Sequence, residues 1–216
     1  MTSRFHEELD RLKADTVAMA TLAIEMLKGS IEALEDRDVG KAERVRARKG
    51  ELARMDLAIE AEAIRLIALY QPVAGDVRKI ACVLKMITYL NRIGRYGKDI
   101  AKIAVEISDQ EHIAKLVDLP DMAERAISMV DDAIEAFMKE DISPLEDFSD
   151  RDDTLDAKRY SIYRECLTYM MEDPQLITRC TQYIMVARYL ERCGDLACKM
   201  AEKIHFMVTG EAIEIK

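Results

Sequence analysis

The chain carries an internal repeat whose two copies start 100 positions apart. The segment 89–95 reads YLNRIGR, and the segment 189–195 reads YLERCGD. Tyrosine, leucine, arginine and glycine recur in register, whereas Asn91 and Arg95 are replaced by Glu191 and Asp195. A repeat of this period predicts two structurally similar packed units that carry different surface chemistry.

Glycine and proline are sparse, so the segments that they separate are long. The sequence has 8 Gly and 4 Pro but 50% apolar and 34% charged residues, a balance typical of long amphipathic helices. Six helices are predicted, at about 3–36, 41–70, 75–108 and 119–140, then from beyond Pro144 to about 171, and finally at 174–208. Because short connections make sequential helices antiparallel neighbours, we predict an all-α fold of two tandem antiparallel three-helix bundles, residues 1–110 and 111–216.

The formal charge of −9 is divided unevenly between the halves. Residues 1–110 hold 19 basic and 18 acidic side chains, whereas residues 111–216 hold 13 basic and 23 acidic ones. An acidic second half disfavours nucleic acid and anionic membranes as partners, because their phosphates would be repelled. It is suited to cations, although a solubilising surface charge is the usual explanation of such a balance.

The cysteines and the N-terminus indicate the compartment. The five cysteines are odd in number and include no C-x-x-C pair, which favours a reducing environment over a disulfide framework. No signal-peptide pattern is present, and no segment is apolar enough to cross a bilayer. We therefore expect a cytoplasmic protein without membrane insertion.

An acidic row lies on the last predicted helix. The core-facing side of this helix is marked by apolar residues at spacings of three and four: Val186, Leu190, Cys193, Ala197, Met200 and Ile204. Glu191 and Asp195 are rotated away from this stripe, and Cys198 and Glu202 continue their row. We therefore expect the row on the outside of the bundle.

The preceding helix supplies further acids. In an antiparallel bundle Asp152, Asp153 and Asp156 can converge with Glu191 and Asp195. Close carboxylates repel one another unless a proton or cation lies among them, and oxygen-rich clusters select ions such as Mg²⁺, Mn²⁺, Fe³⁺ or Zn²⁺. These five residues are the candidate metal ligands, and a solvated acidic face is the alternative.

Other residues near this row have a structural explanation beside a functional one. Cys198 is a candidate soft ligand, but buried cysteines are commonly core residues. His205 lies within a turn of Glu202, although a lone histidine near a helix end is more often structural. Gly94 and Gly194 each cost a helix about 1 kcal/mol relative to alanine. Close approach of a neighbouring helix or room for a metal cluster would explain both.

Two motifs carry a resemblance to a known family. ERCGD at 191–195 with AE at 201–202, and QPVAGDVR at 71–78, resemble the PhoU family of phosphate-uptake regulators, and the likeness covers almost the whole chain. It implies that each repeat is a three-helix bundle with an E/D-x-x-x-D motif on the last helix and further acids on the middle helix, which bind iron or zinc clusters. Glu191 and Asp195 match that motif, and Asp152, Asp153 and Asp156 match the middle-helix acids.

The first repeat departs from this pattern at the motif itself. Asn91 and Arg95 stand where the family has two acids, and Lys98 and Lys102 continue the row. We therefore expect one metal site per chain, in the second repeat. The basic row of the first repeat would fill the space of the lost metal, pair with acids of a neighbouring subunit, or bind an anion.

The resemblance also implies a regulator that acts by protein contact. Its partners would be the ATPase of a phosphate ABC transporter and a sensor kinase, or a simpler phosphate carrier, and we expect a homo-oligomer such as a dimer. A metal-free helical adaptor of a phosphate carrier is one alternative.

A carboxylate-bridged metalloenzyme is the other alternative. Such helical proteins bring Glu-x-x-His pairs from two helices, and His6, His112 and His205 form no such pair. The sequence also lacks a P-loop, a nucleophile elbow and an H-E-x-x-H motif. We therefore predict no catalytic residue and no enzyme.

Overall fold

The computed structural model describes residues 2–113 and 118–215, and these form helices joined by short connections without any strand. Their bounds are α1 Thr2–Asp36, α2 Val39–Ala47, α3 Lys49–Tyr70, α4 Ala74–Glu106, α5 Leu119–Lys139, α6 Phe148–Glu172 and α7 Ile177–Thr209. Two 3₁₀ turns, η2 Ser143–Leu145 and η3 Pro174–Leu176, precede α6 and α7. The all-α prediction is confirmed.

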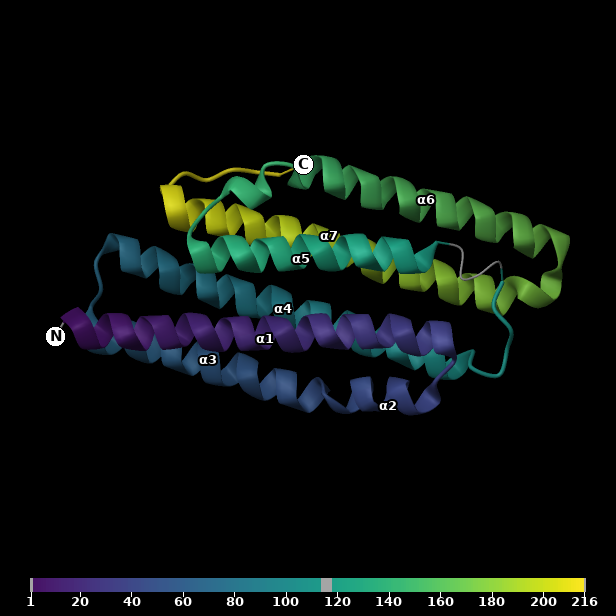
Figure 1. The fold of residues 1–216 in the computed structure, drawn as a ribbon, viewed down its shortest axis with the longest axis horizontal. Helices are drawn as coiled ribbons and strands as arrows, with labels where there is room; N and C mark the ends of the chain where they lie inside the picture. Colours follow the sequence, from purple (N-terminus) through teal and green to yellow (C-terminus); the bar gives the residue numbers. More distant parts are fainter. Residues whose placement is uncertain (1, 114–117, 216) are drawn as a thin grey trace.

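The helices run along the long axis of an elongated molecule (Figure 1). One antiparallel bundle consists of α1, α2 with α3, and α4, and the other consists of α5, α6 and α7. The bundles lie side by side, because α4 packs along α7 and α1 packs along α5. The last helix of each repeat therefore contacts the other bundle as well as its own.

One predicted helix is wrong in detail. The range 41–70 was expected to be continuous, but α2 ends at Ala47 and α3 begins at Lys49. At the junction the Arg48 N–H donates to the carbonyl of Val45 at 3.1 Å, a tighter turn than in an α-helix. The Arg48 guanidinium also donates to Glu25 on α1 at 2.7 Å, and Gly50 lowers the cost of interrupting the helix.

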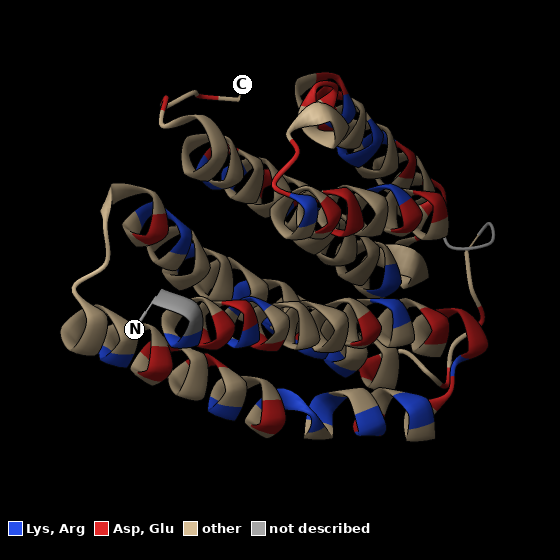
Figure 2. Ribbon diagram, turned by 60° about the vertical axis from the view of Figure 1, so that its left-hand side comes forward, with Lys and Arg blue, Asp and Glu red and all other residues tan. Residues whose placement is uncertain are grey.

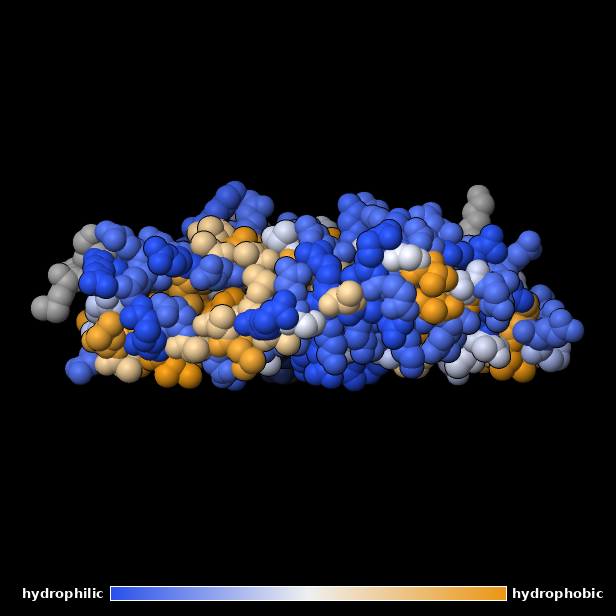
Figure 3. All heavy atoms as spheres, turned by 90° about the horizontal axis from the view of Figure 1, so that it is seen from below, coloured by the Kyte–Doolittle hydropathy of each residue, from blue (hydrophilic) through white to orange (hydrophobic). Residues whose placement is uncertain are grey.

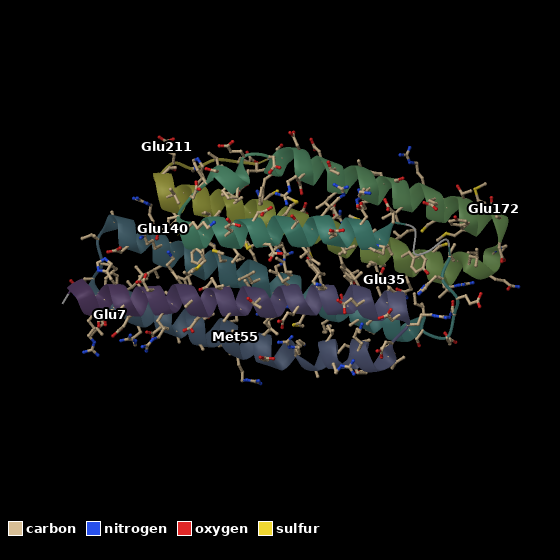
Figure 4. The ribbon with its side chains drawn as sticks, viewed as in Figure 1. Glu7, Glu35, Met55, Glu140, Glu172 and Glu211 are labelled. Carbon is tan, nitrogen blue, oxygen red and sulfur yellow. The ribbon has the colours of Figure 1, made fainter. Side chains whose placement is uncertain are left out.

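The two bundles share one continuous apolar core. Polar contacts join them as well: Glu140, in a left-handed conformation at the end of α5, accepts from Lys13 at 2.9 Å and from Lys79 at 2.8 Å (Figure 4). Tyr96 and Tyr189 stack across the interface, with ring centroids 5.4 Å apart. The bundles are thus held by both packing and ion pairs.

The glycines of the repeated motif face leucines of the middle helices. A Cβ on Gly194 would lie 2.5 Å from Cδ1 of Leu155, and a Cβ on Gly94 would overlap Leu52 in the same way. Close helix approach, the structural explanation of these glycines, therefore holds in both bundles. The two leucines also place α3 and α6 in register, so that Lys49 corresponds to Asp152 and Asp56 to Arg159.

No helix in the described ranges is long and apolar enough to span a membrane. Figure 3 looks onto the side formed by α2 and α3, where apolar and hydrophilic regions alternate. Part of the apolar surface comes from the outer side of α3, on which Leu57, Ile64 and Leu69 are exposed.

Candidate metal centre

The acidic row of α7 is largely buried, which corrects the expectation of an outer face. Glu191 and Glu202 are each 6% exposed and Cys198 is 4% exposed, while Asp195 is partly exposed. The reason is that α7 contacts α4, α5 and α6, so the faces beside its apolar stripe are covered too. The periodicity of one helix reports its own bundle and not the second bundle packed against it.

The packing of α6 on α7 determines which of its acids approach the row. Leu155 is fully buried against Gly194, and this contact places Asp152 so that its Oδ1 would lie 3.2 Å from a Cβ on that glycine. Asp152 and Asp156 are partly buried, whereas Asp153 is exposed. Gly194 therefore also provides space beside the Asp152 carboxylate.

The carboxylates act on one another electrostatically. Burial, followed by the charges of Asp195 and Asp156, raises the pKa of Asp152 to about 6, and Asp153 has the smallest effect on it. Burial and the charge of Asp195 also raise the pKa of Glu191, against the opposing effect of two arginines. Asp152 and Glu191 thus both experience the charges of Asp195 and Asp156, and Asp153 acts weakly on Asp152.

Glu191 has an unpaired buried oxygen. Its Oε1 contacts Arg188 and lies 3.6 Å from Nε of Arg159 on α6, whereas Oε2 is buried with no hydrogen-bond partner in the described parts of the chain. The nearest cation to Asp195 is Arg192, at 3.9 Å. A buried carboxylate oxygen without a partner is costly, and a cation would remove that cost.

Asp152, Asp195 and Cys198 line a pocket of about 280 Å³. It lies between α4, α6, α7 and the segment after α7, and its other lining residues are Arg92, Arg192, Leu196, Lys199 and Ile215. Within residues 2–113 and 118–215, no three Asp, Glu, His or Cys side chains form a ready-made metal-binding group. The oxygen donors fit a hard or borderline cation chemically, but their carboxylates are not gathered around one point.

The other candidate ligands near the row have structural contacts. Burial, with the charge of Asp152, raises the pKa of the Cys198 thiol, and its Sγ lies 3.9 Å from the carbonyl oxygen of Phe148. Glu202 accepts from Lys199 at 2.7 Å and from the Ile215 N–H at 3.2 Å, so it holds the segment after α7. His205 contacts Thr209 and the carbonyl of Glu211.

The first bundle has a polar pair at the corresponding position. Asn91 donates from Nδ2 to Oδ2 of Asp56 on α3 at 2.7 Å, where the second bundle has Glu191 beside Arg159. The acid and its partner have exchanged helices, so each bundle keeps a polar link between its middle and last helices. The sequence shows the change at 91 and 191, but its compensation at 56 and 159 is visible only once the leucine contacts set the register.

Comparison with known proteins places both bundles in one family. The PhoU domain model matches residues 16–104 and 119–204, one stretch in each bundle. A phosphate-specific transport system accessory protein PhoU homolog of Clostridium acetobutylicum is 30% identical over 212 residues, which are 98% of this chain and 97% of that protein. A protein of the same description from Caulobacter vibrioides is 35% identical over 210 residues, 97% and 91% of the two chains.

Solved structures of PhoU proteins have the same fold as this chain. The crystal structure of PhoU from Pseudomonas aeruginosa matches with a TM-score of 0.91 and 31% identity, covering 96% of this chain and all of that one. The phosphate transport system regulatory protein PhoU from Streptococcus pneumoniae matches with a TM-score of 0.89 and 25% identity, covering 97% and 99%. Fold, repeat and sequence therefore lead to one conclusion: the chain belongs to the PhoU family.

Proposed function

We propose that this protein regulates phosphate uptake and phosphate-responsive signalling through protein contact. The observation that carries the proposal is its likeness, over nearly the full length of both chains, to relatives described as accessory proteins of phosphate-specific transport. Its partners are the ATPase of a phosphate ABC transporter and a sensor kinase on the cytoplasmic side, or a phosphate carrier. It acts as a homo-oligomer, such as a dimer, and not as an enzyme.

The second bundle binds a metal ion or cluster as part of this function. Asp152, Asp156, Glu191 and Asp195 are the ligands, with Asp153 as a fifth and more exposed acid, and iron or zinc is favoured over Mg²⁺ or Mn²⁺. What supports the site is the mutual effect of these acids across α6 and α7, together with the unpaired Oε2 of Glu191. A bound cation would offset their repulsion and hold α6 against α7.

Elemental analysis of protein purified without chelator tests the metal centre. Native protein is expected to carry metal, and the double variant Glu191→Gln with Asp195→Asn is expected to lose most of it, since both changes keep the side-chain shape but remove the charge. Asn91→Ala with Arg95→Ala, the matched change in the first bundle, should leave the metal content unaltered. Equal metal in the native protein and the acidic-site variant would rule the site out.

Co-purification tests the regulatory role separately. The tagged protein, expressed together with the phosphate-transport system of its own host, should retain the transport ATPase or the carrier after washing at moderate salt. Loss of every transport component would contradict the contact, whatever the metal content. Turnover of a phosphate ester by the metal-loaded protein, abolished by the acidic-site variant, would instead favour the metalloenzyme.

A further inference from the structure

The first bundle has a basic pocket at the position that corresponds to the candidate metal centre. It occupies about 380 Å³ between the α2–α3 junction and α4, and is lined by Glu43, Arg46, Ala47, Lys49, Lys98 and Lys102. Figure 2 shows basic residues along this junction. The volume lies within the range of small-ligand pockets, ~300–1,000 Å³.

Three of the four basic residues, Lys49, Lys98 and Lys102, replace acids or a thiol of the second bundle. Through the 100-position repeat, Lys98 takes the place of Cys198 and Lys102 that of Glu202. Through the leucine register, Lys49 takes the place of Asp152. The change of sign thus affects two helices that meet at one site.

The cations in this pocket are weakly neutralised. Arg46 pairs with Glu43, Lys98 with Asp99, and Lys102 with Glu106 at 3.4 Å, and all three acids lie within four residues of their partners on the same helix. Exposed pairs of this kind contribute about 0–1 kcal/mol and exchange readily for a stronger partner. Lys49 and the neighbouring Arg95 form no ion pair with any residue in 2–113 or 118–215.

A second copy of the chain is a poor source of the missing negative charge. The row that would complement the basic one contains Glu191 and Glu202, and both are buried in their own subunit. Those carboxylates are unable to reach a pocket on another molecule without unpacking α7. A free anion reaches the pocket without such unpacking, and it is therefore the occupant that the burial of these two acids favours.

We propose that this pocket binds a multivalent phosphate anion, a short chain of phosphoryl groups such as pyrophosphate or tripolyphosphate. Its oxygens would accept from Lys49, Lys98 and Lys102 and from the guanidinium of Arg46, which suits phosphate oxygens in pairs.

This proposal is independent of the metal centre and of the transport partner. It concerns α2, α3 and α4, and it would hold for a PhoU-family protein that carried no metal at all. Metal-depleted protein is therefore the proper material for its test, because phosphate chains themselves bind metal ions.

Isothermal titration of the full-length, metal-depleted protein with sodium tripolyphosphate at physiological ionic strength tests the site. Saturable binding at one site per chain is expected, with pyrophosphate weaker and orthophosphate weakest. The double variant Lys98→Glu with Lys102→Glu should weaken binding by about a hundredfold, because it removes two charge-assisted hydrogen bonds and each contributes roughly a factor of ten. Helix content by circular dichroism checks that this variant is folded.

Two control variants test whether the loss of tripolyphosphate affinity is specific to the pocket. Arg11→Glu with Lys85→Glu makes the same change in net charge at exposed positions outside the pocket and should leave the affinity within about twofold. Asp152→Asn with Glu191→Gln should also bind tripolyphosphate normally. Absence of saturable binding, or equal weakening by the control charge reversal, would overturn the proposal. So would light scattering that shows a dimer dissociated both by tripolyphosphate and by the Lys98→Glu, Lys102→Glu change, since a second copy would then fill the pocket.

Discussion

At the scale of single residues, the carboxylates between α6 and α7 are poorly accommodated in the metal-free protein. Asp152 is the clearest case, since burial and the charges of Asp195 and Asp156 raise its pKa to about 6 from an ordinary 3.8. Its folded form holds a proton more tightly than its unfolded form does. The cost of ionising it is therefore absent below about pH 4, grows between pH 4 and 6, and is complete above pH 6.

Asp152→Asn should accordingly stabilise chelator-treated protein at pH 7.5. The expected gain is about 1 kcal/mol, which allows for solvent screening of this partly exposed group, and it should disappear near pH 4. Urea unfolding at both pH values measures it. The exposed neighbour gives the control, because Asp153→Asn should change little at either pH. A loss of stability at pH 7.5 on removing the Asp152 charge would contradict the repulsive cluster.

The sequence predicted that these acids lie on facing sides of α6 and α7, but it did not predict their burial. Helical spacing shows that Asp152, Asp156, Glu191 and Asp195 can meet, because it fixes which side of each helix they occupy. The same spacing accounts for Arg188, which is three residues before Glu191, but not for Arg159, which meets Glu191 only through the packing of α6 on α7.

At the scale of helices, glycine sets how closely the helices within a bundle pack. Gly97 is the strictest position, since a Cβ there would lie 2.8 Å from the backbone carbon of Met26 and 2.9 Å from the nitrogen of Leu27. These are backbone atoms of α1 and are unable to rotate away. At Gly94 and Gly194 the obstacle is the end of a leucine side chain, which has some freedom to move.

Gly97→Ala should therefore destabilise the protein by about 3 kcal/mol, at the upper end of ordinary overpacking costs. Gly75→Ala is the matched control, because nothing lies within 4 Å of a Cβ at that position of α4. It should be neutral or stabilising by a few tenths of a kcal/mol. Chemical denaturation of the two variants gives the comparison, and similar stabilities would mean that α1 is free to move away from α4.

Helix boundaries were largely predictable, and the exception is instructive. Proline and glycine marked the ends of most elements, since they remove hydrogen bonds or helix propensity locally. The break at Arg48 has a partly tertiary cause, because that side chain bonds to Glu25 on another helix. Local sequence signals do not contain such a contact.

At the scale of the whole molecule, the two bundles share one apolar core and are also linked by the ion pairs of Glu140. Burial raises the pKa of this carboxyl, but hydrogen bonds from Lys13 and Lys79 outweigh burial and leave the pKa below its ordinary value of 4.5. The ion pairs therefore contribute stability above about pH 4.5, and this contribution is lost as the pH falls further. The sequence predicted two bundles but not their alignment, because Lys13 and Lys79 are distant from Glu140 along the chain.

Glu140→Gln should lower stability at pH 7 by about 1 kcal/mol, chiefly because Lys13 is largely buried and would lose its charged partner. The loss of stability relative to native protein should shrink below pH 4.5. Its sign is opposite to that of the Asp152→Asn effect, which is a gain in stability. Thermal unfolding by calorimetry, at pH 7 and below pH 4.5, measures the two differences in stability. It should also show one cooperative transition, since the apolar core is continuous, and two separated transitions would show that the bundles unfold independently.

The leucine-against-glycine contact has a consequence for protein engineering. It sets the spacing of the middle and last helices in each bundle, while the charged positions around it differ freely in sign. The two bundles thus offer equivalent positions around this contact, at which side chains of either charge can be placed. Transplanting acids by Lys49→Asp, Ala53→Asp, Asn91→Glu and Arg95→Asp, together with Asp56→Arg, would recreate the charged site of the second bundle in the first without rebuilding the backbone.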